Sequence, residues 1–291
     1  MSYAGFERFT APAKLKSELW RSLTGLLLIL VLYAVGAVVA IQGAVTIFAG
    51  QIGPGDVAEG RTPLGVAILL FHFAFMAGAV FVVTKYLHRR SIWTLFGDWR
   101  QMQRDFTQMA LVAIAVAVVA NVAAHALFDV TDRMPVTDWL IWLPVALPLV
   151  LLQTGAEELL FRGYLLQQFG ARFGVGARVA WMILPAVIFA VLHVDPASQG
   201  GNIYGVLLVI TIFALITADV TARSGTLGAA WALHFVNNVQ VILLMSLDGP
   251  LTGLSLSSIG IAADDPAALW LFAADAVALI VIYALWRRRY G

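Results

Sequence analysis

The stretch LTGLLLILVLYAVGAVVAIQGAVTIF, residues 23–48, contains no charged side chain. A helix of about 20 such residues crosses a hydrocarbon layer of ~30 Å. Basic residues precede it, as in a secretory signal peptide. However, the uncharged run continues from residue 22 to residue 55, whereas the apolar core of a signal peptide has only about 7–15 residues. We therefore expect this stretch to be a membrane-spanning helix.

The rest of the chain repeats this pattern. Hydrophobic residues make up 61% of the whole chain and charged residues 12%, against about 45–50% and about 25% in soluble domains. Lipid forces each apolar block to satisfy its own backbone, which favours helices. We predict an all-α bundle of eight membrane spans forming a single integral membrane domain over residues 1–291. The seven further blocks are 63–84, 107–128, 139–169, 179–194, 203–218, 226–247 and 267–286.

The basic residues predict the orientation of this bundle. Cytoplasmic loops of membrane proteins carry an excess of Lys and Arg. With eight spans and a cytoplasmic N-terminus, sixteen of the 18 basic residues fall on the cytoplasmic side, and only Arg61 and Arg133 fall outside. We expect a multi-pass protein of the cell (inner) membrane with both termini in the cytoplasm.

Net charge and cysteine content exclude some functions. The net charge of +1 provides no basic tail for a nucleic-acid backbone, so no nucleic-acid partner is expected. The chain has no cysteine, which removes disulfides, thiolate nucleophiles and thiolate metal sites. A metal ion would need His, Asp, Glu or Asn ligands.

The strongest departure from apolar composition is GAEELLFRG, residues 155–163, in the fourth block. Charges at membrane depth are costly and by default suggest a functional site. At 100° per residue, Glu158 and Arg162 lie about 40° apart, as in an ion pair one helical turn long. Glu157 lies about 140° from Arg162, so its side chain is not part of this ion pair and is available for another role. Alternatively, all three side chains form a solvated helix end near the cytoplasm.

Histidines mark two later blocks. FAVLH ends the fifth block at His193, and HFVNN in the seventh block places His234 and Asn238 on one helix face. Each segment also has a simpler interpretation. A lone histidine in an apolar helix is more often a hydrogen-bonded core residue, and His and Asn commonly join neighbouring helices.

The three segments together resemble the CPBP family of intramembrane proteases, which includes the CaaX prenyl endopeptidase. The motifs Glu-Glu-x-x-x-Arg, Phe-x-x-x-His and His-x-x-x-Asn occur in that order. They match at Glu157, Glu158, Arg162, Phe189, His193, His234 and Asn238, within a motif-bearing core at residues 139–247.

The resemblance implies an endopeptidase that cuts a peptide or protein substrate in or near the lipid bilayer. Glu157 resembles the catalytic glutamate, and His193 resembles the residue that helps it to activate a water molecule. His234 and Asn238 resemble the oxyanion-stabilising groups, and Glu158 and Arg162 a supporting pair. A general base in a low-dielectric cavity and fixed neutral donors suit this chemistry.

Several alternatives remain open at this point. Glu157, His193 and His234 could instead hold a zinc ion with one position left for water, so the cofactor is either none or zinc. The buried polar residues could line the pathway of a transporter or channel, or the chain could be a catalytically silent membrane scaffold. His-Glu-x-x-His and Gly-x-Ser-Gly, the marks of two other classes of intramembrane protease, are absent from the sequence. His72 and His125 are expected to be hydrogen-bonding groups between helices.

Overall fold

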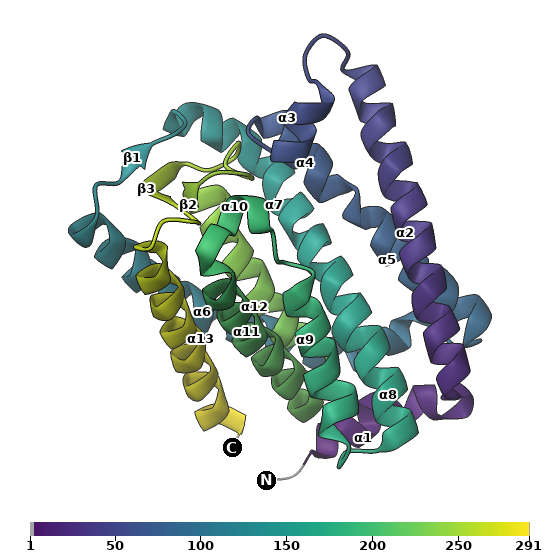
Figure 1. Ribbon diagram of the computed structural model, residues 1–291. Helices are drawn as coiled ribbons and strands as arrows, with labels where there is room; N and C mark the ends of the chain where they lie inside the picture. The colour runs from purple at the N-terminus through teal and green to yellow at the C-terminus, as the bar shows by residue number, and fades with distance from the viewer. Residues whose placement is uncertain (1–2, 291) are drawn as a thin grey trace.

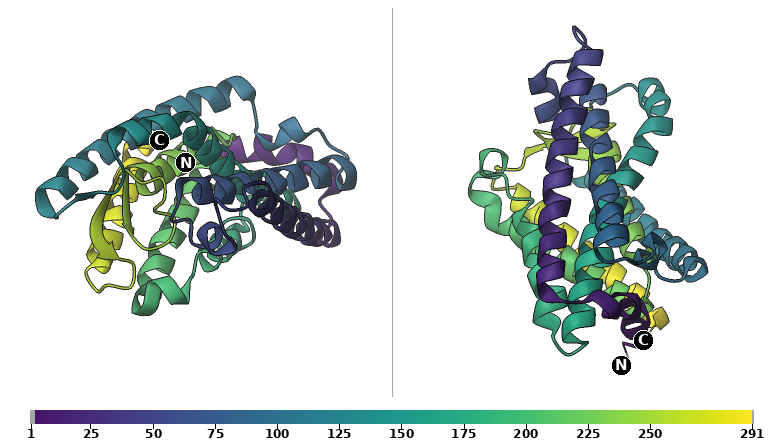
Figure 2. Two further views of the ribbon diagram at one scale, coloured as in Figure 1. Left: turned by 90° about the horizontal axis from the view of Figure 1, so that it is seen from above. Right: turned by 90° about the vertical axis from the view of Figure 1, so that its right-hand side faces the viewer.

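The computed structural model describes residues 3–290 as one bundle of helices with a small sheet at one end (Figures 1 and 2). Several helices continue through short π- or 3₁₀-helical segments, labelled η. The α-helices are α1 (Ala4–Thr10), α2 (Leu19–Ile47), α3 (Pro54–Glu59), α4 (Pro63–Phe71), α5 (Phe73–Val82), α6 (Trp99–Leu127), α7 (Val136–Glu158), α8 (Leu166–Phe173), α9 (Leu184–Val191), α10 (Pro196–Gln199), α11 (Ile203–Ser224), α12 (Gly228–Asn238) and α13 (Ala268–Tyr290). The shorter segments are η1 (Ala11–Lys16), η2 (Val83–Leu87), η3 (Ile92–Leu95), η4 (Leu159–Leu165), η5 (Val179–Ile183), η6 (Gly200–Asn202) and η7 (Val239–Leu244), and the strands are β1 (Thr131–Asp132), β2 (Met245–Asp248) and β3 (Ser257–Ala262).

The prediction of an all-α, polytopic membrane protein is confirmed. Six helical stretches of the described chain are long and apolar enough to cross a membrane: Leu19–Ile47, Pro63–Leu87, Trp99–Leu127, Val136–Phe173, Pro196–Ser224 and Ala268–Arg289. Two shorter apolar helices, Val179–Val191 and Gly228–Leu244, coincide with the fifth and seventh predicted blocks. The count of eight spans therefore stays a prediction, because these two helices are short for a full crossing.

The structure corrects the ends of two predicted blocks. The seventh block was expected to be helical to residue 247, but its helix ends at Leu244 and β2 begins at Met245. The segment MSLD alternates apolar and polar residues, the period of a strand. In the sheet, β3 pairs in parallel with β2 and antiparallel with β1. The fifth helix ends at Val191, which leaves His193 in the turn beyond it.

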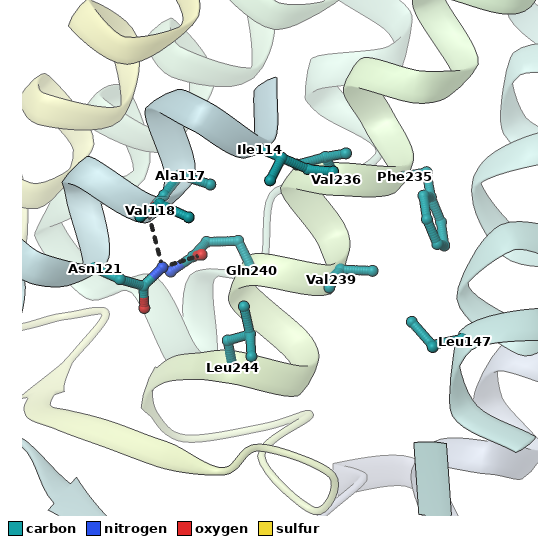
Figure 3. Close-up of a pocket in the computed structure, with 10 residues that line it drawn as sticks. All are labelled: Ile114, Ala117, Val118, Asn121, Leu147, Phe235, Val236, Val239, Gln240 and Leu244. Atoms are coloured by element: carbon teal, nitrogen blue, oxygen red, sulfur yellow. Dashed lines mark hydrogen bonds between the residues drawn. The ribbon is translucent and has the colours of Figure 1, made fainter. Parts of the chain in front are cut away.

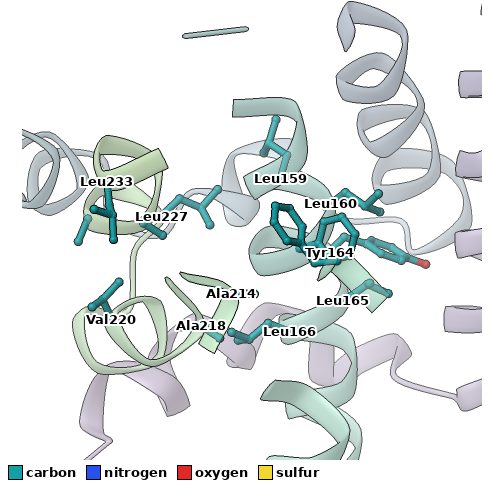
Figure 4. Close-up of a cluster of buried hydrophobic side chains, with 14 of the residues drawn as sticks. Leu159, Leu160, Tyr164, Leu165, Leu166, Ala214, Ala218, Val220, Leu227 and Leu233 are labelled. Atoms are coloured by element: carbon teal, nitrogen blue, oxygen red, sulfur yellow. The ribbon is translucent and has the colours of Figure 1, made fainter. Parts of the chain in front are cut away.

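The buried core gathers around the helices that carry the three motifs. Figure 4 shows side chains of η4 and α8 facing those of α11 and α12. The helices approach closely because small residues lie between them, as is common in membrane bundles. A Cβ atom at Gly155 would come within 2.5 Å of the Trp231 ring, so glycine is needed there. This contact holds α12 against α7 next to the glutamate pair.

Both ends of the described chain are tied to α11. The Tyr3 hydroxyl donates to Oδ1 of Asp219 at 2.7 Å, and the Tyr283 hydroxyl donates to Oδ2 at 2.6 Å. Arg223, one turn beyond Asp219, forms an ion pair with the same carboxylate. Figure 1 accordingly shows α1 and the final turns of α13 at the same end of the bundle. The side of the membrane on which that end lies remains a prediction.

Candidate active site

The glutamate pair lies inside the protein. Glu157 is 6% exposed, Glu158 is 0% exposed and Arg162 is 2% exposed, at the junction of α7 and η4. Hydrophobic side chains of the main core surround this junction. The alternative of a solvated helix end is therefore wrong, because these side chains are buried inside the bundle. Charges buried this deeply require specific partners.

Glu158 has two such partners at a single oxygen. Its Oε1 atom accepts a hydrogen bond from Arg162 at 2.9 Å, as the spacing of the motif predicts, and lies 2.8 Å from Nδ1 of His234. The Arg162 guanidinium also donates to Oγ1 of Thr217 at 2.5 Å. It lies 4.8 Å from the centre of the Phe189 ring, close enough for a cation–π contact. Arg162 thus links α11 and the phenylalanine of the second motif to the glutamate helix.

Glu157 has a different environment from Glu158. Its Oε1 atom accepts a hydrogen bond from the Gln153 amide at 2.9 Å, and Gln153 in turn accepts one from Asn238 at 2.8 Å. Its Oε2 atom lies 3.5 Å from Nε2 of His234. That Oε2 atom is buried and has no hydrogen-bond partner among residues 3–290. Glu157 therefore combines one anchored oxygen with one oxygen available for chemistry.

His234 stands between the two glutamates. Its Nδ1 side faces Glu158 and its Nε2 side faces Glu157. Because a carboxylate only accepts hydrogen bonds, Glu158 selects the form of the ring with a proton on Nδ1.

His193 is connected to this group only through Phe189. Its Nδ1 atom lies 2.8 Å from the Phe189 carbonyl oxygen, and its ring centre is 4.5 Å from the Phe189 ring. The Phe189 ring is also 6.0 Å from the His234 ring. No hydrogen bond or ion pair joins His193 to Glu157 or His234 within the described chain. Phe189 is thus the contact shared by both imidazoles.

The zinc alternative needs Glu157, His193 and His234 in one group. Within residues 3–290, no three His, Asp or Glu side chains gather closely enough to hold a metal ion. Glu157 and His234 meet, but His193 contributes no third donor beside them. The arrangement therefore does not fit the predicted zinc set, and a metalloprotease is not supported.

Sequence reasoning missed the residues that connect the motifs. Gln153 joins Asn238 to Glu157, and Thr217 and Phe213 complete the surroundings of Arg162 and His234. Gln153 precedes Glu157 by one helical turn, so its position on the same helix face was a usable signal. Thr217 and Phe213 carry no such signal, because only tertiary packing brings α11 to the site.

Two π-helical segments adjoin the site. η4 begins directly after Glu158 and contains Arg162, and η7 begins directly after Asn238. Such segments are rare and occur frequently at functional sites, because they leave the regular backbone pattern of the α-helix. Both lie where a motif residue must face a neighbouring helix.

A separate, almost wholly apolar cavity lies beside the site, on another face of α12 and η7. It has a volume of about 280 Å³ and lies between α6, η7 and α7. Figure 3 shows Phe235 and Val239 on one side of it and Leu147 on the other. Asn121 donates to Gln240 at 2.5 Å at its edge. None of the motif residues lines this cavity.

Comparison with known proteins agrees with the motifs. Residues 137–240 match the family of Rce1-like type II CAAX prenyl endopeptidases. This range contains all seven motif residues. An uncharacterized protein of Bacillus subtilis (strain 168), YyaK, is 26% identical over 252 residues, which cover 82% of each chain. No solved structure matches the chain.

The family match and the site describe the same part of the chain. The matched range begins in α7 and ends in η7, the helices that bring the two glutamates to His234 and Asn238. The match of residues 137–240 to Rce1-like type II CAAX prenyl endopeptidases supports membership of the CPBP family.

Proposed function

We propose that this protein is an intramembrane endopeptidase in which Glu157 activates water for attack on a peptide bond. The observation that carries the proposal is the asymmetry of the two glutamates. Oε1 of Glu157 is held by the neutral Gln153 amide and its Oε2 faces Nε2 of His234 at 3.5 Å, whereas Oε1 of Glu158 is shared by Arg162 and Nδ1 of His234. A general base must be held in place and still have an open oxygen; both glutamates have one, but Glu158 is ion-paired with Arg162 and Glu157 is not, which favours Glu157 as the base.

His234 and Asn238 are proposed to stabilise the oxyanion. Each has a donor beyond the bond that positions it: the Asn238 amide has a second N–H, and Nε2 of His234 carries an N–H when the ring is fully protonated. Both side chains are oriented by hydrogen bonds that they donate to α7, where the side-chain oxygens of Gln153 and Glu158 accept them. Donors fixed before the reaction stabilise the developing negative charge without reorganisation.

His193 is proposed to assist Glu157 from the turn after α9. Its Nδ1 atom is occupied by the Phe189 carbonyl, which leaves Nε2 free to contact water. His193 lies in the turn beyond the last helical residue, Val191. Residues at the end of an element move more easily than residues within it.

A transporter or channel explains buried charges but not their arrangement. In this site the charged groups are bonded to one another, and the apolar cavity contains none of them. A pathway for ions or polar solutes would need polar side chains along its wall. A silent scaffold would not need a free carboxylate oxygen beside an imidazole.

The test is a comparison of membranes from cells that contain the wild-type protein or the Glu157→Gln variant, with new peptide termini identified by mass spectrometry. Glu59→Gln, at the exposed last residue of α3, is the matched control. We expect at least one membrane-associated fragment in the wild-type and Glu59→Gln samples and none in Glu157→Gln. The same fragments in all three samples would contradict the proposal.

A further inference from the structure

The first turns of α6 are polar, unlike the rest of that helix. Arg100 and Arg104 lie there, before the apolar block that begins at Thr107. At 1.5 Å per residue, they lie roughly 10 Å and roughly 5 Å outside that block, and a tilt of the helix shortens both distances. The headgroup layer on each side of a bilayer is about 5–8 Å thick. The two guanidinium groups are therefore expected at the level of the lipid headgroups.

Two exposed tryptophans support this depth. Trp93 is 64% exposed and Trp99 is 50% exposed, and their rings meet edge to face with centres 6.2 Å apart. Tryptophan is enriched in membrane proteins at the boundary between lipid and water. The start of α6 also contacts the end of α11, because Gln101 donates to the carbonyl oxygen of Ser224 at 2.7 Å. It therefore lies at the end of the bundle that holds α1 and the last turns of α13.

A shallow, open hollow of about 470 Å³ lies against this part of α6. Its lining consists of five side chains from one face of the helix: Arg100, Gln103, Arg104, Thr107 and Gln108. The buried side chains of α6, among them Met102 and Met109, lie on the opposite face. The hollow therefore opens away from the core of the bundle, towards the surrounding lipid.

The same face of α6 continues as an apolar stripe formed by Leu111, Ile114 and Val118. These three residues lie within about 40° of Arg100 around the helix axis, and they are 64%, 49% and 56% exposed. Ile114 and Val118 also line the apolar cavity between α6, η7 and α7. A charged hollow at headgroup level is thus followed, along one helix face, by an apolar surface at the depth of acyl chains.

The arginines of the hollow have no counter-charge in the protein. Within residues 3–290, neither the guanidinium of Arg100 nor that of Arg104 forms a hydrogen bond or an ion pair. The nearest carboxylates in the sequence are used elsewhere: Asp98 caps the start of α6, and Asp105 is buried and accepts from Thr226. Two cations one turn apart near a helix N-terminus repel each other and oppose the helix dipole. A bound anion would offset both effects, and no carboxylate lines the hollow to receive an ammonium group.

We propose that Arg100 and Arg104 bind the phosphate group of an anionic phospholipid whose acyl chains lie along the apolar stripe of α6. Guanidinium groups bind phosphate strongly through parallel N–H donors. The exposed amide of Gln103, on the same face, donates to a headgroup hydroxyl. A headgroup that is anionic and lacks an ammonium group, such as phosphatidylglycerol, therefore fits the hollow better than a zwitterionic one.

The first test measures lipid binding and does not depend on the proposed proteolysis. Native mass spectrometry of the purified protein in neutral detergent gives the affinity for phosphatidylglycerol and for phosphatidylcholine with the same acyl chains. The wild type should bind phosphatidylglycerol more tightly. The double variant Arg100→Gln/Arg104→Gln should lose about 30-fold in that affinity, because each arginine near an anionic lipid contributes about a fivefold factor. Its affinity for phosphatidylcholine should stay unchanged.

A matched control separates this site from general surface charge. Arg288→Gln/Arg289→Gln removes two charges from exposed residues at the same end of the bundle, outside the hollow. This variant should keep the wild-type affinity for phosphatidylglycerol. Equal losses in the two double variants, or none in Arg100→Gln/Arg104→Gln, would overturn the proposal. Displacement of the lipid by millimolar inorganic phosphate would also overturn it, because the site would then be one for a soluble anion.

The second test locates the acyl chains in vesicles. A phosphatidylglycerol with a photoreactive group in one acyl chain is crosslinked to the reconstituted protein, and the labelled peptides are identified by mass spectrometry. In the wild type the label should concentrate on the α6 peptide that contains Leu111, Ile114 and Val118. Arg100→Gln/Arg104→Gln should lose most of this labelling. Equal labelling of α6 in both proteins, or labelling spread evenly over all lipid-facing helices, would overturn the proposal.

Discussion

Oε1 of Glu158 lies 2.8 Å from Nδ1 of His234, so the second glutamate of the motif fixes the imidazole of a helix 76 residues further along the chain. The same oxygen accepts from Arg162 at 2.9 Å. Glu158 therefore does more than pair with an arginine one turn away. It holds the ring of His234 with Nε2 toward Glu157, and this links the supporting pair to the chemistry.

The buried pair of Glu158 and Arg162 predicts strong coupling in stability. Glu158→Leu or Arg162→Leu alone should lower the free energy of unfolding by about 3–5 kcal/mol, because each leaves a charge buried without its partner. The double variant should lose clearly less than the sum of the two. Unfolding in detergent by denaturant gives the three values, and additive losses would show that the two side chains do not stabilise each other.

Asn238 tests the proposed oxyanion site. Asn238→Ala should lower kcat about 100- to 1,000-fold, the usual loss for one oxyanion donor. KM should change little, because the donor acts mainly in the transition state. Steady-state kinetics with a synthetic peptide that spans a bond identified in the membrane comparison measure both constants, and Asn121→Ala, at the edge of the apolar cavity, is the control. A raised KM with unchanged kcat would make Asn238 a ground-state binding residue instead.

His88 predicts how stability depends on pH. Burial lowers the pKa of His88 from 6.5 to about 4, and its Nε2 atom lies 2.9 Å from the Tyr164 hydroxyl. Between pH 6.5 and 4 the unfolded chain binds a proton that the folded protein does not, so the free energy of unfolding should fall as the pH falls. His88→Gln should reduce this slope in thermal unfolding in detergent, with His125→Gln as the control. Equal slopes in all three proteins would exclude His88 as the source.

The distribution of basic residues predicts the orientation. A reporter that is active only in the cytoplasm should work when fused after residue 291 and should fail when inserted after Gly60. The first result alone requires the C-terminus inside, and the second requires the loop before α4 outside. Activity only after Gly60 would invert the bundle, and an inactive fusion after residue 291 would remove the eight-span topology.

Much of this fold and site could be predicted because the lipid environment places simple physical constraints on the backbone and on charged side chains. Uncharged blocks of about 20 residues must be helices, and charges such as Glu158 and Arg162 within them need partners at helical spacing. The ion pair of Glu158 with Arg162 was predicted in this way and is present at 2.9 Å. Its burial was left open, because sequence position alone does not give depth in the bundle.

The remaining features depend on contacts between distant segments. The bond from Glu158 to His234 and the bridge through Gln153 arise only when α12 packs against α7. Hydropathy alone predicts a helix to residue 247, but the strand β2 begins at Met245. The alternation of apolar and polar residues in this strand covers only four positions, which is too short to stand out within the apolar block. The position of His193 depended on where α9 ends, and no capping residue marks that end in the sequence.

The central claim is that Glu157 is the base that activates water. The most direct measurement is cleavage of the synthetic peptide by purified wild-type and Glu157→Gln protein, combined with binding of the uncut peptide to both. The account predicts that Glu157→Gln binds the peptide with wild-type affinity and cuts none of it, because the amide keeps the shape but takes no proton. Cleavage by Glu157→Gln at the wild-type rate would contradict it.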